Sequence, residues 1–247
     1  MEREWKKYLV PLSDAARNAD DLRKEFWKEK AEVTIRNLRK NDFEACYAEN
    51  REEAAKILLD LIPEGAVVGC GDSHTLFALN VEDQLIDKNC IVISHVCALN
   101  KHAVETETGF RNKDEVRAVI KDILQHYLTS DVFILGAGAI TVDGQIINTD
   151  GRGNRIAGSI YGPDRIIVVA GVNKIVADEK AGRQRIGFIS APMNHLKYGR
   201  NQMPCIKAGI CTNCNHPNRS CHVTSIIHKK PQDSDFYVIL IGEELGF

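Results

Sequence analysis

The residues with the clearest chemistry are four cysteines that lie within seventeen residues near the C-terminus, spaced C-x5-C-x2-C-x6-C. They are Cys205, Cys211, Cys214 and Cys221. Glycine, asparagine and proline residues between them favour turns, which can bring four soft thiolates together as a tetrahedral donor set. Such a set suits either an iron–sulfur cluster or zinc. We therefore expect a metal centre in this segment.

The spacing of these cysteines does not choose between the two cofactors. It matches neither a zinc ribbon of paired C-x2-C knuckles nor the bacterial ferredoxin run. His216 and His222 lie in the same segment, and either imidazole could replace one thiolate. A structural zinc knuckle and an iron–sulfur cluster are therefore both open at this point.

A second candidate site is the glycine turn at 69–75, of sequence GCGDSHT, which follows one expected strand and precedes a helix. Glycines let the backbone approach a ligand, and free N–H groups at a helix N-terminus favour phosphate or carboxylate. We expect Gly71, Ser73 and Thr75 to bind an anionic ligand, with His74 as a candidate acid–base group. The turn is neither a Walker loop nor a complete dinucleotide fingerprint, so a plain connection between elements is the alternative.

A third candidate site follows the hairpin turn that Asp143-Gly144 predicts. Polar side chains concentrate around two glycines just before an expected helix: Asn148, Asp150, Asn154 and Arg155. A plain turn does not need so many donors and acceptors, so we expect a substrate pocket, with Asp150 as a candidate catalytic group. The alternative is that Asp150 and Asn154 only bond to the local backbone.

Asn173 and Lys174 follow a continuous β-branched strand at 165–170. Open α/β sheets bind ligands at the carboxyl ends of their strands, so both residues are candidate ligands of an anionic substrate. Further acid–base candidates are scattered along the chain: His95, His102, His195, Glu107 and Asp143. Neither a zinc-hydrolase motif nor a nucleophile elbow is present, so spacing identifies no catalytic base.

Size, charge and hydropathy exclude several classes of protein. The chain has 247 residues and a formal net charge of −2, without the basic stripe that is typical of nucleic-acid binding. No stretch reaches the roughly 18 apolar residues that cross a bilayer, and the first residues lack the pattern of a signal peptide. We therefore expect a cytoplasmic protein whose remaining cysteines are thiols rather than disulfides: Cys46, Cys70, Cys90 and Cys97.

Hydrophobic patterning predicts an α/β fold with an open, mostly parallel sheet. Strands are expected at 43–48, 66–69, 90–94, 132–135 and 165–170, with helices at 13–40, 50–61, from 73, at 114–128 and at 178–189. After Pro192 the regular pattern breaks into the cysteine segment, and strands at 223–228 and 236–241 finish the chain. We divide the chain into an N-terminal helical region (1–62) within the same domain, an α/β core (63–192), and a cysteine-rich segment with closing strands (193–247).

These motifs together resemble the LUD-domain family, the lactate-utilisation proteins of bacteria and archaea. The likeness rests on separated motifs in one order: 69–75, 148–157, 162–176, 191–194, the cysteine segment and 242–247. The resemblance implies a Rossmann-like fold akin to sugar-phosphate isomerases and CoA transferases, with ligands at the glycine turn and the carboxyl ends of the strands. It also implies a role in oxidising lactate or a related 2-hydroxy acid beside iron–sulfur partner proteins, and it favours a 4Fe-4S cluster over zinc.

Three functions fit the sequence. The first is an iron–sulfur enzyme or redox subunit in organic-acid metabolism. The second is a zinc-stapled isomerase-, transferase- or hydrolase-like enzyme that acts on a sugar phosphate or a CoA ester. The third is a non-catalytic subunit of a redox complex, whose long N-terminal helix contacts a partner protein or a second copy of the chain.

Overall fold

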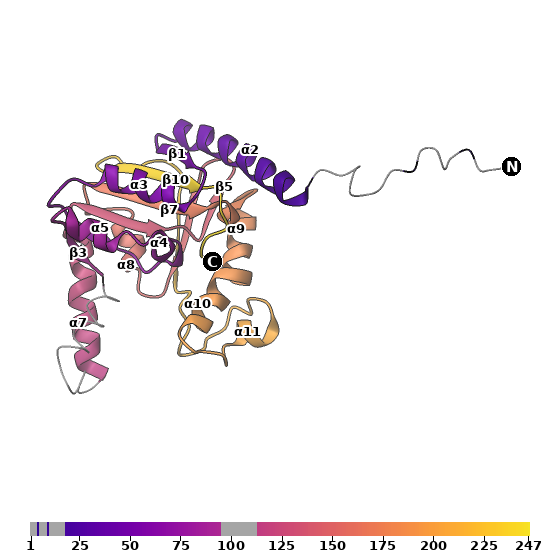
Figure 1. The fold of residues 1–247 in the computed structure, drawn as a ribbon. Helices are drawn as coiled ribbons and strands as arrows, with labels where there is room; N and C mark the ends of the chain where they lie inside the picture. Colours follow the sequence, from indigo (N-terminus) through magenta and orange to yellow (C-terminus); the bar gives the residue numbers. More distant parts are fainter. Residues whose placement is uncertain (1–3, 5–8, 10–17, 95–112) are drawn as a thin grey trace.

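The computed structural model describes residues 4, 9, 18–94 and 113–247 (Figure 1). At its centre lies a six-stranded sheet in which every neighbouring pair of strands is parallel. The strand order is β1 (Glu44–Ala48), β10 (Asp235–Ile241), β7 (Arg165–Gly171), β4 (Val132–Gly136), β2 (Val67–Cys70) and β3 (Ile91–Ile93). This arrangement confirms the predicted open, Rossmann-like α/β sheet. Strands from all three predicted segments enter it, and the division into segments stays a prediction.

Helices cover both faces of this sheet, because its strands are apolar on both sides. Along β10, Phe236, Val238 and Leu240 join one core cluster, whereas Ile239 and Ile241 join the other, as the two-residue repeat of a strand requires. The first face packs against α2 (Ala19–Lys40) and α7 (Lys113–His126). The second face packs against α3 (Arg51–Leu61), α4 (His74–Leu79) and the segment that leads into α5 (Glu82–Asp87).

The long helix α2, which the sequence predicted, lies along one edge of the domain, and only one stripe of it is buried. The buried residues are Ala31, Thr34, Ile35 and Leu38, while Phe26 is largely exposed. Asn18 caps the helix, because its side chain accepts a hydrogen bond from the backbone N–H of Asp20 at 2.8 Å. Residues 13–17 of the predicted helix lie outside the described residues. Among the described helices, none is both long and apolar enough to cross a membrane.

A second, four-stranded sheet was not predicted from the sequence. Its order is β8 (Ile175–Val176), β5 (Ala139–Thr141), β6 (Ile146–Asp150) and β9 (Val223–Ile227). The turn at Asp143-Gly144 joins β5 and β6 as an antiparallel hairpin, which confirms that prediction. β9 pairs antiparallel with β6, and this places Asp150 opposite Val223. The polar segment after β6 therefore lies beside the end of the cysteine segment.

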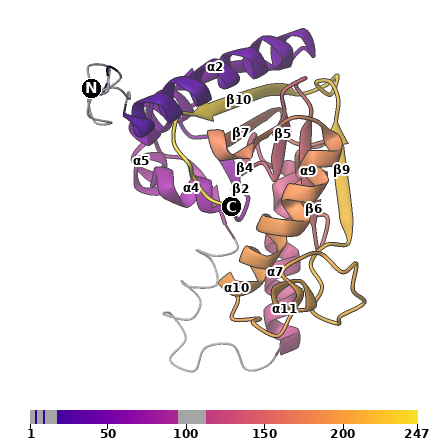
Figure 2. The same ribbon diagram turned by 90° about the vertical axis from the view of Figure 1, so that its right-hand side faces the viewer.

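The helix that begins with α9 (Glu179–Arg185) runs further than the sequence predicted. It passes through a π-helical turn, η4 (Ile186–Ser190), and continues as α10 (Ala191–Lys197). A proline inside a helix removes a backbone hydrogen bond, and the wider π turn directly before Pro192 accommodates that loss. The predicted break after Pro192 is therefore wrong. Figure 2 shows that α10 and α11 (Pro204–Ala208) form a small lobe below the sheets, which we call the cysteine lobe (residues 191–222).

Candidate functional site

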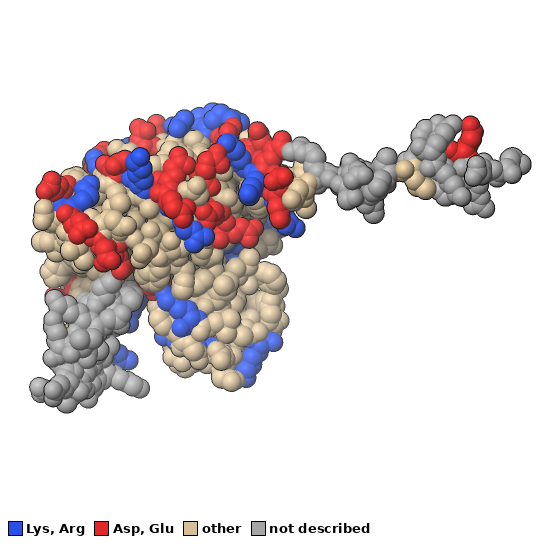
Figure 3. Space-filling view, viewed as in Figure 1, with Lys and Arg blue, Asp and Glu red and all other residues tan. Residues whose placement is uncertain are grey.

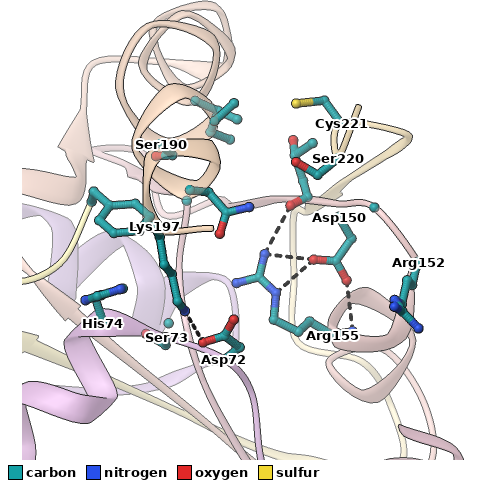
Figure 4. A pocket seen from close by; sticks show the side chains of 18 of the residues that line it. Asp72, Ser73, His74, Asp150, Arg152, Arg155, Ser190, Lys197, Ser220 and Cys221 are labelled. Atoms are coloured by element: carbon teal, nitrogen blue, oxygen red, sulfur yellow. Dashed lines mark hydrogen bonds and ion pairs between the residues drawn. The ribbon is translucent and has the colours of Figure 1, made fainter. Parts of the chain in front are cut away.

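A cavity of about 470 Å³ lies at the carboxyl ends of β2, β4, β6 and β7. Its walls come from the glycine turn, the loop after β4, α8 (Asn154–Gly158), η3 (Val172–Lys174) and α10. Ser220 and Cys221 of the cysteine lobe complete the lining, as Figure 4 shows. The cavity therefore occupies the edge of the sheet where open α/β proteins bind ligands.

The glycine turn contributes two of its three predicted ligand residues to the cavity wall. Ser73 and Thr75 line the cavity, and the Thr75 hydroxyl donates to the carbonyl oxygen of Leu245 at 3.1 Å. Gly71 instead packs beneath the wall, where its N–H donates to the carbonyl oxygen of Ile134 at 2.8 Å. That N–H is therefore occupied, and α4 is only six residues long, so the helix dipole contributes little to anion binding here.

Asp72 connects the glycine turn to the cysteine lobe, which the sequence did not predict. Its carboxylate accepts hydrogen bonds from the Lys197 amine and the Tyr198 hydroxyl, at the end of α10 (Figure 4 shows the Lys197 contact). Burial raises the pKa of Tyr198, and the hydrogen bond to Asp72 raises it further, so this phenol stays protonated as a donor. The lobe is thus attached to the mouth of the cavity.

Asp150 and Arg155 form a partly buried ion pair on the cavity wall (Figure 4). Asp150 is only 5% exposed, and its Oδ1 atom lies 2.8 Å from Nε of Arg155. Its Oδ2 atom accepts the backbone N–H groups of Arg155 and Ile156 at 2.9 and 3.1 Å, which caps α8. Both oxygens are therefore used to hold α8 and orient Arg155. A catalytic role for Asp150 stays a prediction, and this geometry favours a positioning role.

We expect Asp150→Asn to lower the free energy of unfolding by about 2–3 kcal/mol, because it leaves the Arg155 guanidinium without its carboxylate. Urea denaturation measures the change. Glu179→Gln is the control, because it removes an exposed pair with Arg183 that contributes about 0.5 kcal/mol or less. Equal losses from the two substitutions would contradict the assignment of Asp150 as the residue that holds α8.

Three asparagines that the sequence predicted as ligand residues have different roles in the structure: Asn148, Asn154 and Asn173. Asn154 lines the cavity at the start of α8. Asn148 is buried, and its side-chain oxygen accepts the N–H of Gly138 at 2.9 Å, which supports the loop behind the wall. The Asn173 side chain binds the C-terminal backbone, accepting from the N–H of Leu245 and donating to the carbonyl oxygen of Gly246. Asn148 and Asn173 therefore support the wall.

Two histidines lie at the site. His74 lines the cavity and packs against the ring of Phe247 at 4.7 Å, and burial followed by the nearby Lys197 charge lowers its pKa. His195 of α10 is buried within the cysteine lobe, where its Nε2 atom lies 3.2 Å from the Ser220 hydroxyl. Burial also lowers the pKa of His195, so both imidazoles are neutral at pH 7. The predicted candidates His95, His102 and Glu107 lie outside the described residues.

The four predicted metal ligands lie in the cysteine lobe as free thiols. Cys205 is buried in α11, Cys214 and Cys221 are half-buried, and Cys211 is exposed. Burial raises the pKa of Cys221, and the nearby Cys211, Cys205 and Cys214 raise it further. Among the residues that the structure describes, no three Cys, His, Asp or Glu side chains form a group compact enough for a single metal ion.

The backbone of the cysteine lobe is held by Arg219. Its guanidinium donates to the carbonyl oxygens of Cys214 and Cys221 at 2.7 and 2.9 Å. The two histidines that the sequence offered in place of a thiolate make local contacts. Nδ1 of His216 accepts the N–H of Asn218, and Nε2 of His222 lies 2.9 Å from the carbonyl oxygen of Arg219. Four soft thiols without disulfides match the donor preference of an iron–sulfur cluster and of zinc.

The remaining cysteines are separate from the lobe. Cys90 is buried and Cys46 is half-buried, both as thiols without a disulfide, in agreement with their prediction as small apolar residues, and Cys70 is buried at the end of β2. Cys97 lies outside the described residues.

Basic side chains outnumber acidic side chains in the described lining of the cavity. The basic residues are Arg152, Arg155, Lys174, Lys197 and Arg200, and the acidic residues are Asp72 and Asp150. Both carboxylates are engaged in ion pairs within the wall. The cavity therefore favours a small molecule with a negative charge.

Comparison with solved structures finds a crystal structure of a DUF162 family protein from Deinococcus radiodurans. The two are 12% identical with a TM-score of 0.45, over 88% of this chain and 98% of that chain. No curated protein gives a significant match. The sequence model of the LUD domain matches residues 31–241, which include both sheets and the four cysteines of the lobe. The chain therefore belongs to the LUD domain family.

Proposed function

We propose that this protein holds a 4Fe-4S cluster in the cysteine lobe and binds a small organic acid in the adjacent cavity. In this proposal it is an enzyme or redox subunit in the oxidation of lactate or a related 2-hydroxy acid. The proposed cluster ligands are Cys205, Cys211, Cys214 and Cys221. Membership of the LUD domain family supports a role in lactate utilisation at the level of the family.

The observation that carries the proposal is the position of Cys221. The other three cysteines of the lobe lie near enough to this residue to raise its pKa, and Cys221 also lines the cavity. A group bound by Cys221 would therefore adjoin a ligand in the cavity. When bound, a 4Fe-4S cluster supplies one-electron transfer. Arg219 also lowers the pKa of Cys221 against the effect of burial, so it offsets part of the charge of this thiolate.

The cavity charges support an organic acid as the ligand. Arg155 is oriented by Asp150, and a guanidinium can bind a carboxylate through two parallel hydrogen bonds. Ser73 and Asn154 provide further polar groups on the same wall. Oxidation of a 2-hydroxy acid to a 2-oxo acid releases two electrons and two protons. Because a 4Fe-4S cluster passes on one electron at a time, the proposal includes a carrier protein that accepts the two electrons in succession.

The surface of the cysteine lobe suits an acidic carrier protein. No aspartate or glutamate occurs between Lys180 and Gln232, whereas lysines and arginines recur throughout. Figure 3 shows blue among tan side chains on this lobe. Two apolar side chains near the exposed Cys211 are also exposed. Ile210 precedes Cys211 in the chain, and Phe188 follows Gly187 of η4, against which Cys211 packs. Opposite charge would steer an acidic electron carrier to this face.

The test is purification of the full chain without oxygen, followed by metal and sulfide analysis. We expect a brown protein with about four irons and four sulfides per chain. A colourless protein with one tightly bound zinc would instead support the zinc-stapled alternative. Titration calorimetry with lactate, pyruvate and a sugar phosphate then identifies the ligand class, and binding of the sugar phosphate alone would contradict the organic-acid proposal.

A further inference from the structure

Lys174 is a buried amine in the cavity wall. Its side chain is only 2% exposed, and η3 places it directly after β7. The backbone on which it lies is fixed, because the carbonyl oxygen of Asn173 accepts Nε of Arg185 at 2.8 Å. The Asn173 side chain is also bound to the C-terminal backbone. The amine is therefore held by a rigid turn at the carboxyl edge of the sheet.

The charges that act on this amine are positive. No hydrogen bond or ion pair joins it to any residue within the described ranges 18–94 and 113–247. Arg185 and Arg155 both disfavour a positive charge on it. Arg155 is paired with Asp150, and Arg185 donates to the carbonyl oxygens of Asn173 and Gly138. Within the part of the chain that the structure describes, no aspartate or glutamate pairs with this amine to offset the water that a buried ammonium loses.

These surroundings favour the neutral form of the amine. Burial lowers the pKa of Lys174 from its ordinary value of 10.5 to about 7, and the charges of Arg185 and Arg155 add to the effect. A neutral amine has a free lone pair, and burial beside another cation is a known way to activate a lysine that attacks carbonyl groups. Simple anion binding would be served better by an ordinary, fully charged lysine.

We propose that Lys174 attacks the carbonyl carbon of a 2-oxo acid and holds the acid as an imine. The nitrogen lone pair forms a bond to C2, the carbonyl oxygen leaves as water with both amine protons, and no oxidant or reductant is consumed. This inference rests on the proposed function for the class of acid, since a 2-oxo acid is the oxidised form of a 2-hydroxy acid. The carboxylate of the acid would offset the charges of Arg155 and of a protonated imine.

The test is reductive trapping in the full chain as purified, with pyruvate as the probe and cyanoborohydride as the reductant. We expect one adduct per chain, with the mass of pyruvate plus two hydrogens minus one water, and peptide mapping should place it on Lys174. Lactate has a hydroxyl in place of the ketone at C2, so it should form no adduct itself and should reduce trapping by competing for the cavity. An unmodified protein, or an adduct on other lysines only, would overturn the proposal.

Variants separate the site from general lysine chemistry. Lys174→Met keeps a long unbranched side chain without the amine, and we expect the adduct yield to fall at least about tenfold. Lys180→Met, at an exposed position on α9, should react as the parent protein does. Circular dichroism confirms that both variants fold, and the mapping of the parent protein stands independently of them. Equal yields in the parent protein and Lys174→Met would refute the assignment.

The yield should also depend on pH when cyanoborohydride is saturating, so that reduction of the protonated imine does not limit it. Lys174 reacts as the neutral amine, so trapping should increase as the pH rises through about 7. The charged and titratable groups that face it are Arg155 and Arg185, which stay charged, and His74, whose lowered pKa keeps it neutral over this range. A yield that falls over this interval would contradict a nucleophilic amine. Iron analysis is independent of trapping, so failure of the cluster proposal and failure of this one are distinguishable.

Discussion

Replacing Cys221 with alanine should yield a colourless protein that retains only a small fraction of the about four irons expected in the parent protein. The other three cysteines of the lobe raise the pKa of Cys221, which also lines the cavity. A cluster that loses this thiolate has one iron open to solvent and to oxygen, so the cluster should be lost during purification. Iron and sulfide analysis, together with the visible spectrum of protein purified without oxygen, measures the effect.

Cys46→Ala is the matched control for this substitution. Cys46 is a free, half-buried thiol in β1, where it lies opposite Ile239 of β10 in the central sheet. Its removal should leave iron and sulfide unchanged, because it is not among the thiols that act on Cys221. Iron retained in full by Cys221→Ala, or lost equally from both variants, would contradict the proposed ligand set.

Replacing Lys174 with methionine should stabilise the fold, although it removes a residue of the cavity. The pKa of Lys174 is about 7 in the folded protein and 10.5 in its ordinary state. The unfolded chain therefore binds more protons between these pH values, so this amine opposes folding near pH 7 and does so less as the pH rises. We expect Lys174→Met to raise the free energy of unfolding by roughly 2–4 kcal/mol at pH 7.

Chemical denaturation at two pH values checks this expectation. The difference between the variant and the parent protein should shrink as the pH rises from 7 toward 10, since the unfolded amine then also loses its proton. Lys180→Met, at an exposed position, should change the stability little at either pH. A Lys174→Met protein that is less stable than the parent at pH 7 would show that the amine has a stabilising partner, and this would also weaken the imine proposal.

The central sheet could be predicted from the sequence because its signals are local. The β-branched run in β7 and the spacing of apolar residues in α3 and α7 identify buried strands and one-sided helices without knowledge of their neighbours. The second sheet could not be predicted in the same way. β8 has only two residues, and β6 pairs with β9, which lies more than seventy residues later in the chain. Such pairing depends on tertiary contacts rather than on local pattern.

The candidate site was also only partly predictable. Residues that follow strands, such as Ser73 and Lys174, could be assigned to the cavity because the carboxyl ends of parallel strands meet at one edge. The contact of Asp72 with Lys197 and Tyr198 could not be predicted, because it joins two segments about 125 residues apart. It also depends on the continuation of the helix into α10, which the sequence did not predict. Gly71 and Asn173 were assigned to the ligand, yet their polar groups bind other parts of the chain.

Electron paramagnetic resonance of the reduced protein, with and without pyruvate, tests most directly whether the cysteine lobe and the cavity form one redox site. Because Cys221 lines the cavity, we expect a signal from a reduced 4Fe-4S cluster, and we expect the shape of this signal to change when pyruvate occupies the cavity. Protein that is purified without oxygen, contains zinc in place of iron and gives no signal on reduction would contradict the account.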